Sequence, residues 1–522
     1  MSYDVIIVGG GAAGLTAAAF LAKSGRSTLL LEQQAKCGGL VNSFRRGDFI
    51  FDGGIRALEN AGVLFPMIKQ LGIDVELIRS RVSLGIEDKV IAVESSDNLE
   101  EYENLLKDLY PESAVEISAI MREIEKITRF MDIQYGINNP LFLDVKANRD
   151  YFIKEVFPWM FKYMFNVPKV SARNRPVVQH LQKFTDNQAL IDIIAQHFFR
   201  DTPAYFALSY FRLYCDYYYP KGGTGVFTKT LAEFIRQKGG EIRTGAAVRS
   251  INLEKKTVKT DQEEIGYKQL LWAADQKTLY KMIDLDQVDQ KTVDIVAQKQ
   301  ASLEHLSGND SVLTLYLFSD LDKKYFRDIS AGHFFYTPSR KGQSLAGSPP
   351  KNGSWEAVKA WLDLFLAYTT YEISIPALRD ESMAPPGKTG LIVSVLFDYQ
   401  LTKYIVDQGW GERFSEAVTE MMINALDQTI YPGLKASVFD SFTATPVTLQ
   451  KITGNTDGAI TGWSFTNPSM PAENRLVRIS NAVKTPLADV TQAGQWTYSP
   501  SGFPVSLITG KLAADRVNKL IK

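Results

Sequence analysis

Three glycines near the start of the chain have the spacing of a phosphate-binding turn. Gly9-x-Gly11-x-x-Gly14 directly follows residues 5–8, an apolar run typical of a buried parallel strand. In such a turn the first glycine permits the tight bend, the second lets the backbone approach a pyrophosphate, and the third lets helix and strand pack closely. The free amides at the start of the next helix, together with its dipole, hold the phosphate charge. The spacing therefore predicts a dinucleotide-binding site.

The elements around these glycines complete a strand–turn–helix–strand unit that ends on an acid. Residues 15–24 are typical of an alanine-rich helix, and residues 28–31 are typical of the next buried strand. Glu32 follows, 18 residues after Gly14, which is close to the ~20 residues expected for an acid that binds a ribose hydroxyl. Its negative charge would repel a 2′-phosphate, so the unit favours FAD or NAD over NADP.

A second set of glycines gives a family resemblance. Gly38-Gly39 follows Glu32, and residues 51–54 (Phe-Asp-x-Gly) come next. This combination resembles the N-terminal FAD signature of the amine oxidase and phytoene desaturase superfamily, in which the glycine pair runs along the phosphate and ribityl side of the flavin. The resemblance implies FAD as the cofactor. Amine oxidases usually place arginine directly after the pair, whereas this chain has Leu40. That difference favours the group of phytoene desaturases, carotenoid isomerases and retinol saturases.

The C-terminal segment supplies the second half of the expected cofactor site. Pro504 can occupy the first turn of a helix, and Gly502 precedes it. By the resemblance, the positive end of this helix points at the flavin ring and stabilises negative charge on reduced flavin. The family often has two or three glycines at this turn, whereas residues 499–501 are Ser-Pro-Ser here. The resemblance also implies that Val248 meets the adenine and that Ala274 ends a strand beside the dinucleotide. The residues expected to hold FAD are Gly9, Gly11, Ala13, Gly14, Glu32, Gly38, Gly39, Val248, Ala274, Gly494, Gly502 and Val505.

The composition excludes several other classes of function. Lysine and arginine total 58 and aspartate and glutamate total 59 among 522 residues, so the chain lacks the basic excess of a nucleic-acid binder. Two cysteines and four histidines exclude a disulfide framework and a four-cysteine zinc site, and we expect no bound metal. The two cysteines fit a reducing cytoplasm. No apolar run is long enough to span a membrane, and the N-terminus does not resemble a signal peptide.

No pattern of residues identifies a catalytic acid, base or nucleophile. His197 and His333 lie among aromatic residues and are expected to be structural. Glu372 and Asp398 could be acids near a site, but each is more typical of a solvated strand end. We therefore expect bound flavin to carry the redox step, a hydride transfer between a substrate carbon and flavin N5, while the protein supplies position and electrostatics. The sequence names no electron acceptor.

Two segments are unusually rich in aromatic residues, 151–165 and 198–219. Core packing is one explanation, but an apolar tunnel for a long polyene or isoprenoid would need such a lining. The residues expected to line that tunnel are Phe206, Tyr210, Tyr214 and Tyr218. The lysines within 151–165 also suit a helix that rests at a membrane interface. We therefore expect a cytoplasmic protein, with a peripheral membrane contact as a further expectation.

These observations predict an α/β fold in which an FAD-binding Rossmann-like (βαβ) domain is interleaved with an α+β substrate domain. The FAD-binding domain would take residues 1–80, 215–300 and 475–522, and the substrate domain 81–214 and 301–474. The predicted function is that of an FAD-dependent oxidoreductase, resembling the phytoene desaturases. It would desaturate, saturate or isomerise carbon–carbon bonds of an apolar polyene or isoprenoid such as a carotenoid or retinoid. Two alternatives stay open: a flavin amine oxidase, and a non-catalytic chaperone on the same fold that binds prenyl groups or lipids.

Overall fold

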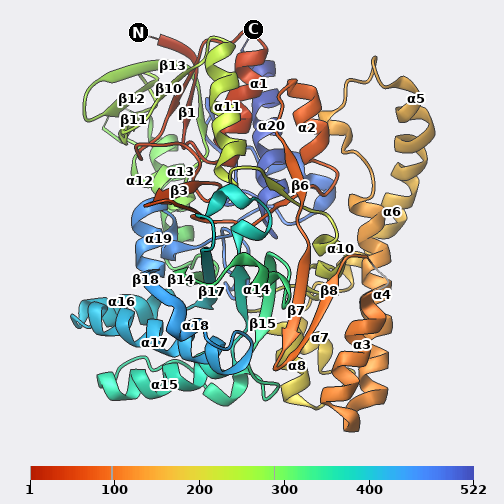
Figure 1. Ribbon diagram of the computed structural model, residues 1–522. Helices are drawn as coiled ribbons and strands as arrows, with labels where there is room; N and C mark the ends of the chain where they lie inside the picture. Colours follow the sequence, from red (N-terminus) through yellow and green to blue (C-terminus); the bar gives the residue numbers. More distant parts are fainter. Residues whose placement is uncertain (1, 96–97, 287, 522) are drawn as a thin grey trace.

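Two large β-sheets organise the chain, and Figure 1 shows one above the other. The computed structural model describes residues 2–95, 98–286 and 288–521. The strands of the first sheet are β1 (Ser2–Val8), β2 (Thr28–Leu31), β10 (Glu241–Arg243), β11 (Val248–Asn252), β12 (Thr257–Thr260), β13 (Glu264–Trp272) and β19 (Val490–Gln492). Their order is β10-β2-β1-β13-β12-β11, and β19 pairs with β13. β1 is parallel to both of its neighbours, β2 and β13, and residues 5–7 of β1 are fully buried, as a strand covered on both faces requires.

Three helices lie side by side against the first sheet in Figure 1: α1 (Ala12–Lys23), α11 (Gly225–Gln237) and α20 (Phe503–Leu520). Residues 17–19 of α1 are alanines without exposed surface, so neighbouring backbones approach closely. Gly510 of α20 touches α1 directly, because a Cβ added there would lie 2.5 Å from the carbonyl oxygen of Ala13. The C-terminal helix is therefore part of the same layer as the N-terminal helix, although almost the whole chain separates them.

One face of the second sheet is covered by helices, and the other is directed toward the first half of the chain. Its strands are β7 (Val82–Ile86), β8 (Lys89–Val93), β14 (Ser311–Ser319), β15 (His333–Thr337), β16 (Tyr371–Ser374), β17 (Thr389–Phe397) and β18 (Val438–Ala444). Their order is β18-β14-β17-β16-β15-β7-β8, and only the β15–β7 pair is parallel. Alternate residues, such as Ile373 and Val393, pack under α15 (Trp355–Tyr368) and α17 (Gly411–Thr429). The residues between them, such as Glu372 and Ser394, point to the other face.

A group of helices lies at the right of Figure 1, and most of its members pack against β7 at one end of the second sheet. Its members are α3 (Asn98–Leu109), α4 (Ala114–Tyr135), α5 (Arg149–Tyr151), α6 (Phe157–Ser171), α7 (Val177–Leu181), α8 (Gln188–Ala195), α9 (Ala204–Ala207) and α10 (Tyr210–Tyr214). A π-helical turn, η3 (Phe152–Val156), joins α5 to α6, and Pro158 lies in the first turn of α6. Among the described residues, no helix combines the length and the hydropathy needed to cross a bilayer.

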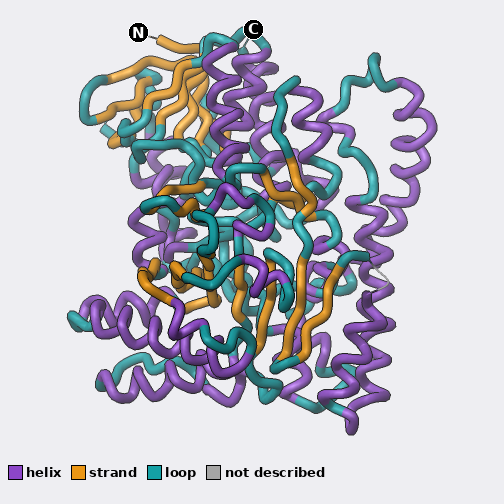
Figure 2. The backbone as a smooth tube through the Cα atoms, viewed as in Figure 1, coloured by secondary structure: helices purple, strands orange, loops and turns teal. Residues whose placement is uncertain are grey.

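Two small sheets connect the large ones, as the short orange segments in the centre of Figure 2 show. β3 (Ser43–Arg46) pairs with β4 (Phe49–Asp52), and β9 (Tyr217–Pro220) lies between β5 (Leu58–Glu59) and β6 (Leu77–Arg79). The remaining helices are α2 (Leu64–Leu71), α12 (Gln276–Lys281), α13 (Gln290–Glu304), α14 (Lys323–Arg327), α16 (Tyr399–Asp407), α18 (Leu434–Ser437) and α19 (Pro446–Thr453). The arrangement confirms the predicted α/β fold. The domain boundaries stay a prediction, since the sheets record only which strands pair.

Candidate functional site

The glycine turn has the geometry that its sequence predicts. Gly9 follows β1 at a φ of +105°, and α1 begins two residues after Gly10. A Cβ added at Gly14 would lie 1.9 Å from the carbonyl oxygen of Gly9, so a side chain at this position is excluded. Gly11 is the N-cap of α1, and its own lack of a side chain leaves the first amides of the helix uncapped. The turn therefore presents free backbone donors and the positive end of a helix dipole.

Open space lies beside this turn and fits a bound dinucleotide. A Cβ added at Gly11 would meet no described atom within 4 Å, whereas one added at Gly39 would lie 3.2 Å from Gly11. The amide of Gly38 donates to the carbonyl of Gly10 at 2.8 Å, which fixes the second glycine pair against the turn. The glycines thus form a cradle in which a ligand can touch backbone where side chains would otherwise stand.

Glu32 lies behind the cradle with half of its hydrogen-bonding capacity in use. Its Oε2 accepts from the amide of Gly10 at 2.7 Å, and its Oε1 accepts from the amide of Gln34 at 2.8 Å. Burial raises the pKa of the Glu32 carboxyl, and these backbone donors oppose the rise. A carboxylate offers about four acceptor sites, so two are available for the hydroxyl groups of a ribose.

The C-terminal segment extends the cradle toward the second sheet. A Cβ added at Gly494 would lie 3.4 Å from the Cβ of Ala13. The amide of Gly494 donates to Thr509 Oγ1 at 3.0 Å. α20 runs parallel to α1, because Gly510 lies beside Ala13 and Asn518 hydrogen bonds to Ser24. α20 begins at Phe503, so its N-terminus reaches about 10 Å beyond that of α1 at ~1.5 Å per residue. Both helix starts lack a side-chain cap.

The structure places the other predicted cofactor residues around this line. Ala274 adjoins Gly9, since a Cβ added at Gly9 would lie 3.4 Å from the Cβ of Ala274. Val248 begins β11, just after Ala246 donates to the carbonyl of Glu32 at 2.9 Å. Gly502 and Val505 lie at the start of α20, where a Cβ added to Gly502 would meet no described atom within 4 Å. The twelve residues named from the sequence therefore belong to the first sheet, the helices packed on it and the loops between them. Their individual contacts with the cofactor stay predictions.

Three of the four predicted lining residues form a ring cluster against the second sheet. The ring of Tyr210 lies 5.4 Å from that of Phe206 and 5.6 Å from that of Tyr214. The ring of Tyr214 lies 5.2 Å from that of Phe335 on the second sheet. Tyr218 does not join them. It packs on Phe65 instead, because neighbouring residues of a strand point to opposite sides.

Side chains in this region lie deep in the protein and still keep uncovered surface. Burial lowers the pKa of His197 to about 3 and raises the pKa of Glu59 to about 7, yet both residues are only partly covered. Glu372 is equally deep, and 33% of its side-chain surface is uncovered. Deep side chains keep uncovered surface where they line an internal cavity. Accessible surface therefore remains inside the protein between the aromatic cluster and the second sheet, and we call this space the cavity.

A polar group closes the side of this cavity formed by the second sheet. His333 Nε2 lies 2.9 Å from Glu372 Oε1, and the ring of Tyr217 stacks on His333 at 5.6 Å. Arg56 donates through Nη2 to Ser394 at 2.8 Å, and Ser394 is the cross-strand partner of Glu372. The expectation that Glu372 is a solvated strand end is wrong, because β16 is an inner strand of the sheet. Asp398 caps α16 through Leu401, and it is not part of this group.

Tyrosines connect the start of α20 with the cavity. Tyr498 precedes α20, and burial together with Tyr205 and Tyr135 raises its pKa. Burial raises the pKa of Tyr135 as well, and Tyr205 and Glu59 add to that rise. These mutual effects place the residues within electrostatic range of one another. Tyr135 and Tyr205 therefore lie near both Tyr498, which precedes α20, and Glu59.

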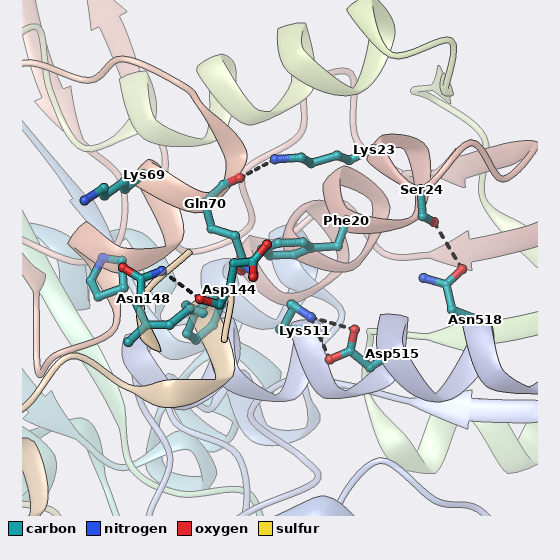
Figure 3. Close-up of a pocket in the computed structure, with 13 residues that line it drawn as sticks. Phe20, Lys23, Ser24, Lys69, Gln70, Asp144, Asn148, Lys511, Asp515 and Asn518 are labelled. Atoms are coloured by element: carbon teal, nitrogen blue, oxygen red, sulfur yellow. Dashed lines mark hydrogen bonds and ion pairs between the residues drawn. The ribbon is translucent and has the colours of Figure 1, made fainter. Parts of the chain in front are cut away.

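A hollow on the surface lies elsewhere (Figure 3). It has a volume of about 450 Å³ between the C-terminal half of α1, α2, α20 and the loop around Asp144. Lys511 lies inside it, paired with Asp515 at 2.5 Å, and Lys23 donates to the carbonyl of Gln70. Gly11 and Gly14 lie at the opposite end of α1. The hollow is therefore separate from the glycine cradle. No cluster of acidic, histidine or cysteine side chains suited to a metal occurs in the described chain.

The cavity makes stability depend on pH through Glu59. Its pKa is about 7 in the folded chain against an ordinary 4.5, so the folded state binds the extra proton between these values. Folding stability from Glu59 is then complete below about pH 4.5 and is lost as pH rises through about 7. We expect Glu59→Gln to raise the free energy of unfolding by about 2–3 kcal/mol at about pH 8 and to change it little near pH 4.5. Denaturant unfolding at both pH values measures this.

The control is Glu76→Gln, since the Glu76 side chain is 68% exposed. It should change the free energy of unfolding by less than about 1 kcal/mol at either pH, because an exposed ion pair contributes little. The burial of Glu59 would be contradicted if Glu59→Gln changed the free energy of unfolding by the same amount at both pH values.

Comparison with known proteins gives the family. Residues 12–518 match the model of the family described as flavin containing amine oxidoreductase. The chain is 23% identical to all-trans-retinol 13,14-reductase of Danio rerio, with 94% of this chain and 82% of the relative aligned. It is 21% identical to 4,4'-diapophytoene desaturase of Staphylococcus aureus, with 99% of both chains aligned. It is 24% identical to prolycopene isomerase of Daucus carota, over 87% of this chain and 71% of the relative.

Solved structures support the fold. An oxidoreductase from Methanosarcina mazei superposes with a TM-score of 0.61 and 14% identity, over 99% of this chain and all of that one. Cyclohexylamine oxidase from Brevibacterium oxydans superposes with a TM-score of 0.58 and 13% identity, over the whole of both chains. The open glycine cradle fits FAD, and the family match confirms FAD as the cofactor and the chain as an oxidoreductase. The chain belongs to the family of flavin containing amine oxidoreductases.

Proposed function

We propose that this oxidoreductase acts on carbon–carbon bonds of an apolar polyene or isoprenoid, such as a carotenoid or retinoid. The observation that carries the proposal is the aromatic cavity that begins at the tyrosines next to α20. Rings of Phe206, Tyr210 and Phe335 offer apolar surface and few hydrogen-bond donors, which suits a long hydrocarbon chain. The names of three relatives, a retinol reductase, a diapophytoene desaturase and a prolycopene isomerase, support the same class of substrate.

The chain's own residues would position the reactants. Bound FAD supplies hydride transfer to or from a substrate carbon. The free amides of α1 and Glu32 would hold the pyrophosphate and the ribose, and the uncapped start of α20 would stabilise negative charge on the ring. The aromatic cavity would orient the polyene and exclude water from the reacting carbons. Desaturation, saturation and isomerisation could all use this arrangement.

The two alternative functions receive less support. Leu40 stands where amine oxidases usually carry arginine, and it lies beside the glycine cradle. A non-catalytic lipid chaperone would not need the complete FAD fingerprint that the chain carries. Mass spectrometry of lipid that copurifies with the enzyme tests the proposal. We expect a polyene or isoprenoid, and an enzyme that forms hydrogen peroxide from added amines but binds no polyene would contradict it.

We further propose that the enzyme works in the cytoplasm at a membrane surface, through one face of η3 and α6. Six large apolar side chains recur on this face at helical spacing, and each is more than half exposed: Ile153, Phe157, Met160, Phe161, Met164 and Phe165. The opposite face is anchored, since Trp159 donates to the carbonyl of Ile133 and Asn166 donates to that of Phe130 at 2.7 Å. Soluble surfaces rarely carry an apolar patch of this kind unless it binds something.

The charges around this face favour a lipid surface with anionic headgroups. Lys162 and Lys169 flank the apolar residues along α6, while Lys154 pairs with Asp150. A basic flank beside an apolar stripe is typical of helices that lie in a membrane interface. On the inner side of α6, Tyr163 lies within electrostatic range of Tyr135 and Tyr498. An apolar substrate leaving the bilayer at this helix would therefore be close to the cavity.

The membrane contact predicts a loss of binding when the apolar face is changed. We expect the triple variant Phe157→Ser, Phe161→Ser, Phe165→Ser to bind vesicles of phosphatidylcholine and phosphatidylglycerol at least about tenfold more weakly, since each lost ring removes apolar burial. Sedimentation with vesicles measures this. The matched control replaces three exposed apolar residues elsewhere by serine, Val115, Leu345 and Val477. Equal vesicle binding by both triple variants would contradict the docking face.

A further inference from the structure

The polar side of the cavity contains several buried groups that lack a partner. Among the described residues, Arg56 Nε, Arg379 Nε, His333 Nδ1 and Tyr214 Oη have no hydrogen-bond partner. Arg379 donates to the backbone carbonyl of Arg56 at 2.7 Å, and Tyr217 contacts both Tyr214 and His333. The unpartnered groups are therefore neighbours. These four atoms have almost no accessible surface, so a ligand in the cavity would meet Glu372, whose side chain is 33% uncovered, in front of them.

Glu372 is the member of this cluster that faces the cavity. A third of its side-chain surface is uncovered, while His333 is 3% exposed and lies behind it. The hydrogen bond from His333 and the charges of Arg56 and Arg379 lower the pKa of Glu372 against the effect of burial. Burial lowers the pKa of His333, and its Nε2 lies 2.9 Å from Glu372 Oε1. Glu372 is therefore an ionised acceptor on the polar side of the cavity.

The charges around Glu372 are already balanced. Arg56 and Arg379 contribute two positive charges, and Glu372 and Asp52 contribute two negative charges within the same electrostatic neighbourhood. Glu59 lies further along the cavity, and its pKa of about 7 keeps it protonated at about pH 6. A ligand carrying an ammonium group would leave one charge uncompensated in a region of low dielectric, which is costly. A neutral hydrogen-bond donor adds no charge and so avoids this cost.

We propose that Glu372 accepts a hydrogen bond from a neutral hydroxyl group at one end of an otherwise apolar polyene. The inference rests on the proposed function, because it takes the aromatic cavity as the substrate site. It narrows the substrate to a chain with an alcohol end. Glu372 recognises that end, and His333 is a positioning residue that holds the carboxylate.

Three retinoids test the inference with the natural enzyme loaded with FAD. All-trans-retinol carries a free hydroxyl, retinyl acetate has no donor, and retinylamine carries an ammonium group. At about pH 6 we expect retinol to bind roughly 10- to 100-fold more tightly than either of the others, as a hydrogen bond to a charged acceptor allows. Quenching of tryptophan fluorescence measures binding without turnover.

Variants assign the preference to Glu372. Glu372→Gln keeps the shape of the side chain, and we expect retinol binding to weaken about tenfold while retinyl acetate binding is unchanged. Glu381→Gln is the matched control, because Glu381 is 72% exposed in an ion pair outside the cavity. It should bind all three retinoids as the natural enzyme does. Flavin content and melting temperature verify that each variant is folded.

The outcomes separate this inference from the proposed function. Retinol and retinyl acetate binding equally well to the natural enzyme would overturn the role of Glu372 and leave the polyene cavity standing. Retinylamine binding most tightly would overturn the charge argument and support amine oxidation. An enzyme that binds none of the three retinoids contradicts the inference and the proposed function together.

Discussion

A Gly11→Val variant is expected to fold and to be colourless. Space for the new side chain exists, because a Cβ at this position meets no described atom within 4 Å and the φ of −76° suits any residue. The same space is where a pyrophosphate would touch the first amides of α1. Losing two charge-assisted hydrogen bonds at about 1.5 kcal/mol each weakens FAD binding by at least about 100-fold. Flavin absorbance of the purified variant, followed by titration with FAD, measures the loss.

Gly411→Val is the matched control for this experiment. Gly411 begins α17, and an added Cβ there also meets no described atom within 4 Å. It should retain FAD with the affinity of the natural chain. A Gly11→Val variant that is equally yellow would show that FAD does not approach the backbone at this turn.

Glu32→Ala is expected to weaken FAD binding by about 100-fold as well, for a different reason. The change removes the acceptor for two ribose hydroxyls, each worth about 1.5 kcal/mol or more when the acceptor is charged. It also leaves the amides of Gly10 and Gln34 without their present partner, so the FAD-free chain should lose roughly 1–3 kcal/mol of stability. FAD titration and denaturant unfolding separate the two effects.

Glu32→Gln provides the intermediate case. It keeps one acceptor oxygen and the volume of the side chain, so its FAD affinity should fall between that of Glu32→Ala and that of the natural chain. Full FAD affinity in Glu32→Ala would contradict the assignment of Glu32 to the ribose.

The cofactor half of the site could be predicted from the sequence because its determinants are local. Gly9, Gly14 and Glu32 each act within one strand–turn–helix–strand unit, so spacing along the chain fixes their positions in space. The start of α20 could be predicted for a similar reason, since Pro504 marks the first turn of this helix.

The cavity half could not be predicted in the same way, because strand pairing builds it. His333 and Glu372 are 39 residues apart and meet only because β15 pairs with β16. The alternation Tyr-Glu-Ile-Ser at 371–374 was an available signal, since its two apolar residues face the helices and Glu372 must then face the other side. An aromatic count could not separate Tyr218 from the other three residues, because the register of β9 decides the direction of its side chain.

The aromatic segment 151–165 shows a related limit. Its spacing along the chain indicated helix but not which face is covered. The structure shows that Trp159 is anchored on α4 through the carbonyl of Ile133, while Phe157 and Phe161 are exposed. Burial of a helix face depends on the neighbouring helix, and no local pattern determines that partner.

The central claim is that FAD in this chain exchanges hydride with a polyene. The most direct test incubates the FAD-loaded enzyme anaerobically with a polyene, all-trans-retinol or 4,4'-diapophytoene, with the flavin either oxidised or chemically reduced. Flavin absorbance and chromatography with mass spectrometry of the polyene are then recorded together. We predict that the redox state of the flavin changes while the polyene gains or loses two hydrogens, or that the polyene changes its double-bond geometry. Unchanged polyenes, together with flavin reduction by an added amine, would contradict the account.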